Sequence, residues 1–193
     1  AVEAPKMETK CKSLPKADTL AEDVRSCAVY AAADGSLGIA WEGGVCAMTP
    51  LEVQMGGVCL KDRELILHDS KTTMHRLTEM GLAFDGCVFD TALAAYDLNP
   101  SQSDYPVSKL ATNFLGVSVE DGDAAGCAEA VWNLRSVLHE ELKAQGMEAL
   151  YFDMELPLCA VLYRMEKAGI AIDREQLQQF GQMLGQRIDD CEA

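Results

Sequence analysis

Carboxylates are the residues of this 193-residue chain most able to do chemistry, and three of them fall close to the ends of apolar runs. Asp69 follows a run rich in Leu and Ile, Asp85 precedes Gly86, and Asp90 follows a second short run. Because Mg²⁺ prefers oxygen ligands, a metal site built from Asp69, Asp85 and Asp90 is one interpretation. The interpretation we favour is structural: Asp69 and Asp90 stand where helices are expected to begin and would cap them, and Asp85 is expected in a turn.

Eight cysteines and three histidines offer a second set of metal ligands and nucleophiles. No two cysteines have a CxxC-type spacing, and no histidine stands near enough to complete a zinc ligand set. Most cysteines lie in apolar surroundings, which indicates buried free thiols. We expect His68 to be a structural residue at a strand end, and His75 and His139 to be exposed on helices. The cysteines are Cys11, Cys27, Cys46, Cys59, Cys87, Cys127, Cys159 and Cys191.

The net charge of −15 argues against an independent DNA-binding module, since such a module is expected to present a basic face. Trp41 and Trp132 lie outside any aromatic-plus-basic pattern that would stack bases. The longest apolar runs are shorter than the ~20 residues of a membrane helix. Ala1–Lys16 is mixed and charged, unlike a cleavable signal. We therefore expect a cytoplasmic protein without membrane contact.

The elements that must position these residues begin with three short predicted strands at 26–32, 37–41 and 45–48. They are separated by Asp34-Gly35 and Gly43-Gly44, which are turn signals typical of an antiparallel meander. Strand–helix alternation follows, and it predicts a mixed sheet flanked by helices, an α/β fold. The alternating elements are a strand at 64–68, a helix at 69–80, a strand at 87–89, a helix at 90–98 and a helix that begins at Asp104–Pro106 and stops at Gly116.

The last third of the chain is predicted to be helical. One helix is expected at 124–144, and a second at 147–168 has apolar residues at the spacing of one buried face. A third helix is expected after Asp173, with an apolar stripe of its own. The apolar residues of the helix at 147–168 are at positions 147, 150, 151, 154, 158, 161, 162 and 165. The apolar stripe of the helix after Asp173 comprises Leu177, Phe180, Leu184 and Ile188.

Composition divides the chain into three parts. Residues 1–25 are polar, carry Pro5 and Pro15, and are predicted to be a linker. Residues 26–146 form the predicted domain, and residues 147–193 form helices that lead away from it. Since the chain starts without Met and stops inside a predicted helix, we expect it to be a fragment of a longer protein.

Two segments resemble family A bacterial DNA polymerases. The segment 89–100 is similar to the family's FDTxLAAYLLNP stretch, and the segment 155–173 is similar to the stretch that joins the 3′–5′ exonuclease domain to the polymerase domain. The resemblance covers roughly residues 26–193. It implies a ribonuclease H-like fold whose chemistry uses two divalent metals held by four carboxylates.

Those four carboxylates are missing at the positions that the resemblance assigns to them. Tyr30 and Ala32 stand at the Asp-x-Glu of the first motif, and Thr73 stands at the Asp of the second. In the third motif, Tyr-x-x-x-Asp, an ungapped alignment places Gly122 at the Tyr and Gly126 at the Asp. A small gap would bring in Asp121 or Asp123 instead.

The resemblance therefore implies an exonuclease-like domain without catalytic, metal-ligating or cofactor-binding residues, acting as a scaffold inside a DNA polymerase I. Its expected partners are the polymerase domain of the same chain, which uses Mg²⁺, and DNA through that parent enzyme. The resemblance also implies an upstream 5′-nuclease domain, from which the scaffold would space the polymerase. The fragment is expected to be monomeric. Two alternatives stay open: a weak metal-dependent 3′–5′ exonuclease that uses the displaced carboxylates, and an acidic protein-interaction module.

Overall fold

The computed structural model describes residues 4–7, 9, 20, 24–56 and 58–192. Contacts divide the chain into two units, Ala1–Tyr163 and Arg164–Ala193. The first unit contains the sheet and is described first. The second contains the end of one helix and the whole of α8 (Arg174–Glu192).

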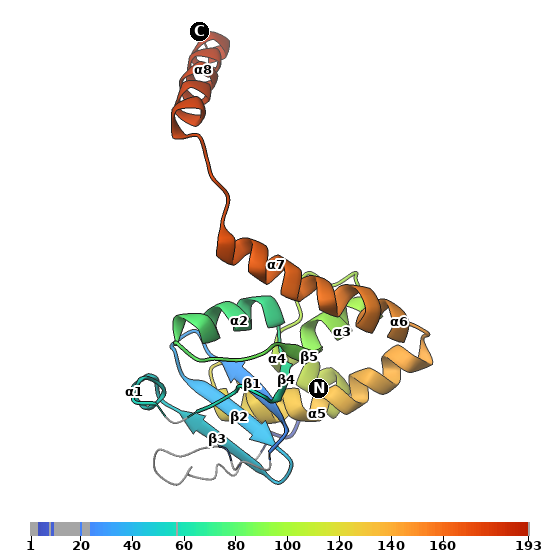
Figure 1. Ribbon diagram of the computed structural model, residues 1–193. Helices are drawn as coiled ribbons and strands as arrows, with labels where there is room; N and C mark the ends of the chain where they lie inside the picture. Colours follow the sequence, from blue (N-terminus) through green and yellow to red (C-terminus); the bar gives the residue numbers. More distant parts are fainter. Residues whose placement is uncertain (1–3, 8, 10–19, 21–23, 57, 193) are drawn as a thin grey trace. The chain divides into compact units, whose positions relative to one another are not determined.

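A mixed sheet of five strands, in the order β3-β2-β1-β4-β5, organises the first unit (Figure 1). β1 pairs antiparallel with β2, and β2 pairs antiparallel with β3, which confirms the predicted meander. β1 pairs parallel with β4, and β4 pairs parallel with β5. The strands are β1 (Ser26–Ala31), β2 (Leu37–Trp41), β3 (Gly44–Met48), β4 (Glu64–Leu67) and β5 (Cys87–Asp90).

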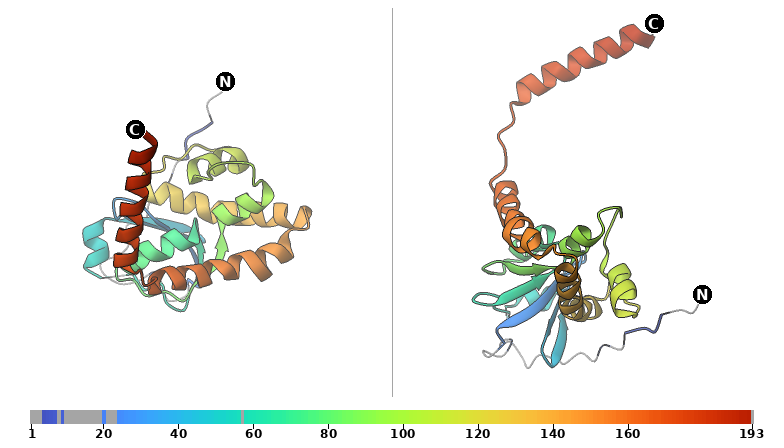
Figure 2. Two further views of the ribbon diagram at one scale, coloured as in Figure 1. Left: turned by 90° about the horizontal axis from the view of Figure 1, so that it is seen from above. Right: turned by 90° about the vertical axis from the view of Figure 1, so that its right-hand side faces the viewer.

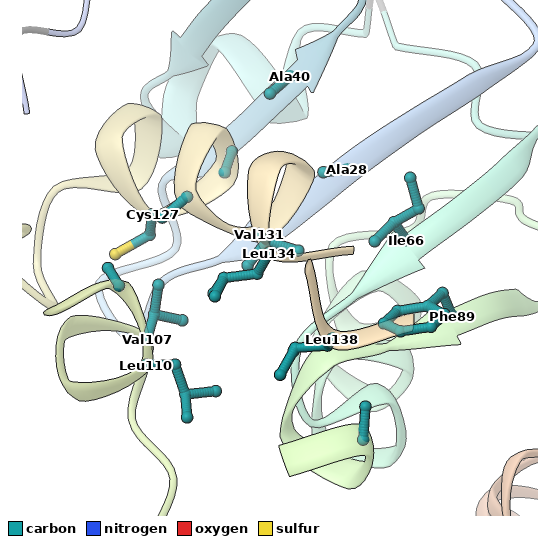
Figure 3. Packing of buried hydrophobic residues seen from close by; sticks show 14 of the residues in the cluster. Ala28, Ala40, Ile66, Phe89, Val107, Leu110, Cys127, Val131, Leu134 and Leu138 are labelled. Atoms are coloured by element: carbon teal, nitrogen blue, oxygen red, sulfur yellow. The ribbon is translucent and has the colours of Figure 1, made fainter. Parts of the chain in front are cut away.

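Helices cover both faces of this sheet, which confirms the mixed α/β layer architecture (Figures 1 and 2). α5 (Ala124–Ala144) packs on one face, where alternate strand residues such as Ala28 and Ile66 meet its apolar side (Figure 3). α2 (Ser70–Glu79) packs on the other face against Val29. Because side chains alternate along a strand, the same strands supply both cores.

The predicted helix boundaries are confirmed where a local cap specifies them. Thr49 and Glu52 form a capping box at α1 (Pro50–Gln54). Asp69 caps α2, and Asp90 caps α3 (Thr91–Leu98). The helical segment predicted to stop at Gly116 consists of α4 (Val107–Leu110) and the π-helical turn η1 (Ala111–Leu115).

The apolar stripe predicted over 147–168 is wrong beyond its first turn. Residues 148–168 are helical, but a π-helical turn, η2 (Tyr151–Glu155), separates α6 (Glu148–Leu150) from α7 (Leu156–Ala168). A π turn adds a residue to the helical repeat and so rotates the face that follows it. The inward residues are now Tyr151, Leu156 and Tyr163, which pack against the two cores. The residues left exposed are Met154, Leu158, Val161, Leu162 and Met165.

Single predictions about side chains have mixed outcomes. Free thiols are confirmed for the cysteines that the structure describes, but burial is confirmed only for Cys27, Cys46 and Cys127. Cys87 and Cys159 are partly buried, and Cys59 and Cys191 are exposed. Cys11 lies outside the described residues. His75 and His139 are half-buried instead of exposed, because each ring packs on an aromatic neighbour: His75 on Tyr163 and His139 on Phe152. No helix in the described part of the chain has the length and apolar character needed to span a bilayer.

Candidate functional site

The carboxyl ends of three parallel strands meet at one edge of the sheet, and this edge carries the positions singled out by sequence. β1, β4 and β5 run in the same direction, so the residues that follow them lie along a shared border. Such borders are where α/β sheets usually place their sites. We call this border the carboxyl edge and define it by residues 30–32, 68–73 and 90, with the 121–126 segment that Tyr30 joins to it.

Tyr30 reaches across the edge to the loop that precedes α5. Its hydroxyl donates a hydrogen bond to the backbone carbonyl of Asp121 over 3.0 Å. The Asp121 carboxylate accepts from the backbone N–H of Ser108 at 3.1 Å and from the Ser108 hydroxyl at 2.8 Å. Burial raises the pKa of Tyr30 to about 12, so the phenol stays protonated and neutral at physiological pH. This position therefore supplies a structural donor.

Ala32 lies beside a cationic group. It lines a cavity of about 330 Å³ together with Arg76, Glu79 and Val53. The Arg76 guanidinium donates to the carbonyl of Ala31 over 2.6 Å, at the end of β1. A methyl side chain offers no ligand atom, and the adjacent positive charge disfavours a divalent cation.

Thr73 and Gly126 each donate a hydrogen bond to a residue nearby in the sequence. The buried Thr73 hydroxyl donates to the carbonyl of His68 over 2.7 Å. Gly126 lies in the first turn of α5, where its N–H donates to the carboxylate of Asp123, the N-cap residue, over 3.1 Å. A Cβ at position 126 would lie 2.6 Å from Asp123 Oδ2. A longer side chain at 126 therefore requires the cap of α5 to move.

Asp90 is the most heavily bonded acid of the edge. Its buried carboxylate accepts from four backbone N–H groups that belong to two helix starts, so it fastens the beginnings of α2 and α3 to each other. The donors and distances are Asp69 (3.1 Å), Ser70 (2.6 Å), Ala92 (2.9 Å) and Leu93 (3.2 Å).

Asp69 and Asp85 also accept hydrogen bonds from backbone amides. Asp69 has a left-handed backbone and caps Thr72 at 3.4 Å. Asp85 accepts from the N–H of Asp62 over 2.5 Å, joining two loops. The structure thus brings Asp69 and Asp90 together through a backbone bond and uses Asp85 elsewhere. Over the part of the chain that the structure describes, no three His, Cys, Asp or Glu side chains group as a metal site would require.

His68 lies at the same edge, at the end of β4. Its Nδ1 is 2.9 Å from the hydroxyl of Thr91. Burial lowers the pKa of His68, while the nearby carboxylates of Asp90 and Asp69 act in the opposite direction. A neutral, bonded imidazole agrees with the structural role predicted for it.

Two residues that contact the carboxyl edge were missed by sequence reasoning. Arg76 stands three residues after Thr73, so the helical repeat alone places it on the same face as that position. Tyr151 forms the other missed contact: its hydroxyl donates to the Asp90 carbonyl at 3.0 Å and accepts from the Asp90 N–H at 2.6 Å. The sequence contains no local signal for that bond, because the partners are 61 residues apart.

Comparison with known proteins identifies relatives of this chain. It is 32% identical to the DNA polymerase I of Mycobacterium bovis over 146 residues, which cover 65% of this chain and 16% of that protein. It is 29% identical to the DNA polymerase I of Bacillus subtilis over 144 residues, which cover 64% of this chain and 16% of that protein. The chain thus spans about a sixth of these relatives. No family model matches it.

Solved structures give the same relationship. A structure described as the POL domain of Pol1 from M. smegmatis, in complex with DNA primer-template and dNTP, superposes with a TM-score of 0.69 at 28% identity. The match covers 86% of this chain and 31% of that chain. A crystal structure of a protein from Bifidobacterium adolescentis shares the fold, with a TM-score of 0.56 at 21% identity, over 69% of this chain and 40% of that one.

Proposed function

We propose, from the homology of this chain to bacterial DNA polymerase I, that it is the exonuclease-like portion of such an enzyme and serves as a scaffold without nuclease chemistry of its own. The fold we assign is ribonuclease H-like. The enzyme as a whole would act on DNA in replication and repair, with Mg²⁺ at its polymerase site, in the cytoplasm.

The observation that carries this proposal is which side chains occupy the carboxyl edge and which hydrogen bonds they make. The positions of the first two motifs hold Tyr30, Ala32 and Thr73, and the acids nearby bind backbone N–H groups. A divalent ion needs several free oxygen ligands in a fixed geometry. Carboxylates that cap helices are already committed to other partners, and Arg76 adds a positive charge beside Ala32.

The exposed side of η2 and α7 supports the scaffold half of the proposal. Met154, Leu158 and Leu162 are exposed at helical spacing, next to a face held by Tyr151 and Tyr163. Exposed apolar stripes of this kind are typical of packing surfaces. Since this chain corresponds to only 31% of the M. smegmatis chain, we assign the partner of this stripe to the polymerase part of the longer protein.

A nuclease assay tests the missing chemistry. The chain is incubated with single-stranded DNA labelled at the 5′ end, with Mg²⁺ or Mn²⁺, and an active proofreading exonuclease serves as the positive control. We expect no trimming of 3′ ends above that of a chain-free blank. Trimming that is abolished by EDTA would contradict the proposal.

The same assay tests the alternative in which the chain is a weak exonuclease. A weak exonuclease built from displaced carboxylates would lose its activity in Asp69→Asn and Asp85→Asn, which remove single acids, while Asp153→Asn, at an exposed position, serves as a matched control.

The net charge of −15 is the observation behind a third candidate, an acidic interaction module. Capture of a basic protein that is lost at moderate salt would support that candidate instead.

A further inference from the structure

The beginning of the chain, although predicted to be a linker, makes backbone hydrogen bonds with the body of the domain. The N–H of Met7 donates to the carbonyl of Ser118 over 3.0 Å, and the N–H of Ser118 donates to the carbonyl of Pro5 over 2.8 Å. Lys6 and Ser118 therefore form a parallel β-bridge. Such main-chain pairing is how an extended peptide adds to an existing edge.

Side chains strengthen this pairing on both sides. Met7 packs against the core that lies between α5 and the sheet. Lys6 Nζ lies 2.7 Å from Glu120 Oε1, in an ion pair whose two side chains are about three-quarters exposed, at 72% and 74%. An exposed pair contributes little to stability because solvent screens it, so the backbone bonds and Met7 carry most of the attachment.

A second attachment lies further along the same segment. Leu20 is 1% exposed and belongs to the core on the opposite face of the sheet, with Val29 and Leu77. The Arg63 guanidinium donates to the carbonyl of Leu20 over 3.0 Å and also to the carbonyl of Val24. The segment is thus fastened at Met7 to one core and at Leu20 to the other.

We propose that Pro5–Met7 and Leu20 together act as a strap: these two attachments make the start of the chain an integral part of the domain and fix the point at which any preceding polypeptide leaves it. Its acceptor surface is the Val117–Glu120 edge beside the loop that leads to α5, and its occupant is the segment Pro5–Met7 of the same chain. The consequence for spacing an upstream domain rests on the proposed scaffold function. The attachment itself does not.

The length of the segment shows why attachment matters. A flexible chain of about 20 residues has a root-mean-square end-to-end distance of roughly 25 Å, because this distance grows as about 5–6 Å times the square root of the residue number. A strap held at Ser118 removes that freedom. The distance between an upstream domain and the carboxyl edge would then be set at Pro5, beside Ser118, instead of at Arg25.

Hydrogen exchange on the whole chain tests the strap through two amides. In the unaltered chain, the N–H groups of Met7 and Ser118 are expected to be protected. Met7→Pro removes the N–H that donates to Ser118, whereas Met7→Ala removes the side chain and keeps that N–H. We expect the Ser118 amide to exchange at least about tenfold faster in Met7→Pro than in Met7→Ala, and Lys6→Ala to change it by less than about fivefold.

Limited proteolysis provides the second readout. Cleavage on the N-terminal side of Val24 is expected to be faster in Met7→Pro than in Met7→Ala, with the far-UV circular dichroism of both variants unchanged. Equal Ser118 exchange in the two variants, or an unprotected Ser118 amide in the unaltered chain, would overturn the strap. These outcomes do not depend on nuclease activity, so the failure of the strap and the failure of the scaffold proposal are distinguishable.

Discussion

Two regions around α5 differ in how they constrain the sequence. Where α5 crosses β2, the backbones approach so closely that a Cβ at Gly38 would lie 1.8 Å from the carbonyl oxygen of Ala124. At the carboxyl edge, a phenol, a methyl group and a hydroxyl stand where the resemblance expects metal ligands, and each has a place in the packing. The contact between the first residue of α5 and β2 therefore admits one residue type at position 38, whereas positions 30, 32 and 73 hold side chains other than the expected ligands and are still packed or hydrogen-bonded.

The largest effect is expected from breaking the close approach. Gly38→Ala forces α5 away from β2 because backbone atoms cannot yield as a flexible side chain does, and we expect a loss of at least about 3 kcal/mol of unfolding free energy. Urea denaturation of the chain measures it. Gly122→Ala is the matched control, since a Cβ there meets no atom within 4 Å, and a loss above about 1 kcal/mol in that control would weaken the argument.

The second prediction addresses the edge, where acids serve as caps. Asp90→Ala leaves four backbone N–H groups of α2 and α3 without their acceptor, three of them bonded at 3.1 Å or less. Charged acceptors and helix caps each contribute on the order of 1–3 kcal/mol, and we expect a loss of about 3 kcal/mol in thermal or urea unfolding. Asp90→Asn keeps one carbonyl oxygen and is expected to lose less. Equal losses in the two variants would count against the capping role.

A third, smaller effect is expected at the hydroxyl that holds η2 to the edge. Tyr151→Phe removes the group that both donates to and accepts from the backbone of Asp90, leaving a buried N–H and carbonyl unpaired. Such unpaired groups cost about 1–3 kcal/mol, so we expect a loss of about 2 kcal/mol. Tyr96→Phe is the control, because Tyr96 is exposed. A Tyr151→Phe chain as stable as its control would show that η2 is held by packing alone.

The sequence predicts those parts of this molecule that local chemistry specifies. The capping box at Thr49, the caps at Asp69 and Asp90, and the turns at Gly35 and Gly43 each depend on a few neighbouring residues, and the structure confirms the caps and the strands that these turns connect. That positions 30, 32 and 73 hold no carboxylate can be read directly from the sequence, whereas their assignment as ligand positions of the family stays a prediction.

The contacts that sequence reasoning missed join distant residues. Tyr30 and Asp121 are 91 residues apart, and nothing near Tyr30 indicates the carbonyl that it binds. The π turn at Tyr151–Glu155 changed which residues of the next helix face inward, because it shifts the helical register. Its local signal is Pro157, which has no N–H to donate to the carbonyl of Asp153, and sequence reasoning did not use that signal. The role of Gly38 depends on how near α5 comes, which only the assembled fold determines.

The smallest effect is expected at Asp97, a second acid near η2 that contrasts with Asp90 because its charge does not stabilise the fold. Asp97 lies on α3 and is 8% exposed, and its Oδ2 finds no hydrogen-bond partner among the described residues. Burial raises the pKa of Asp97 from 3.8 to about 6, and the charge of Glu155 is a lesser cause of the same shift. The folded state therefore retains a proton that the unfolded state releases near pH 4, so stability falls as the pH rises from about 4 to about 6.

Asp97→Asn cannot lose that proton, and its stability relative to the unaltered chain should depend on pH. Above pH 7 we expect the variant to be more stable by about 1 kcal/mol, because it removes a buried charge that has no partner at Oδ2. Near pH 4 the two chains are expected to unfold at the same urea concentration. Asp153→Asn, at an exposed acid on η2, provides the baseline. A constant difference between Asp97→Asn and the unaltered chain from pH 4 to pH 8 would mean that Asp97 finds a partner in solution, and that this acid, like Asp90, belongs to the structural set.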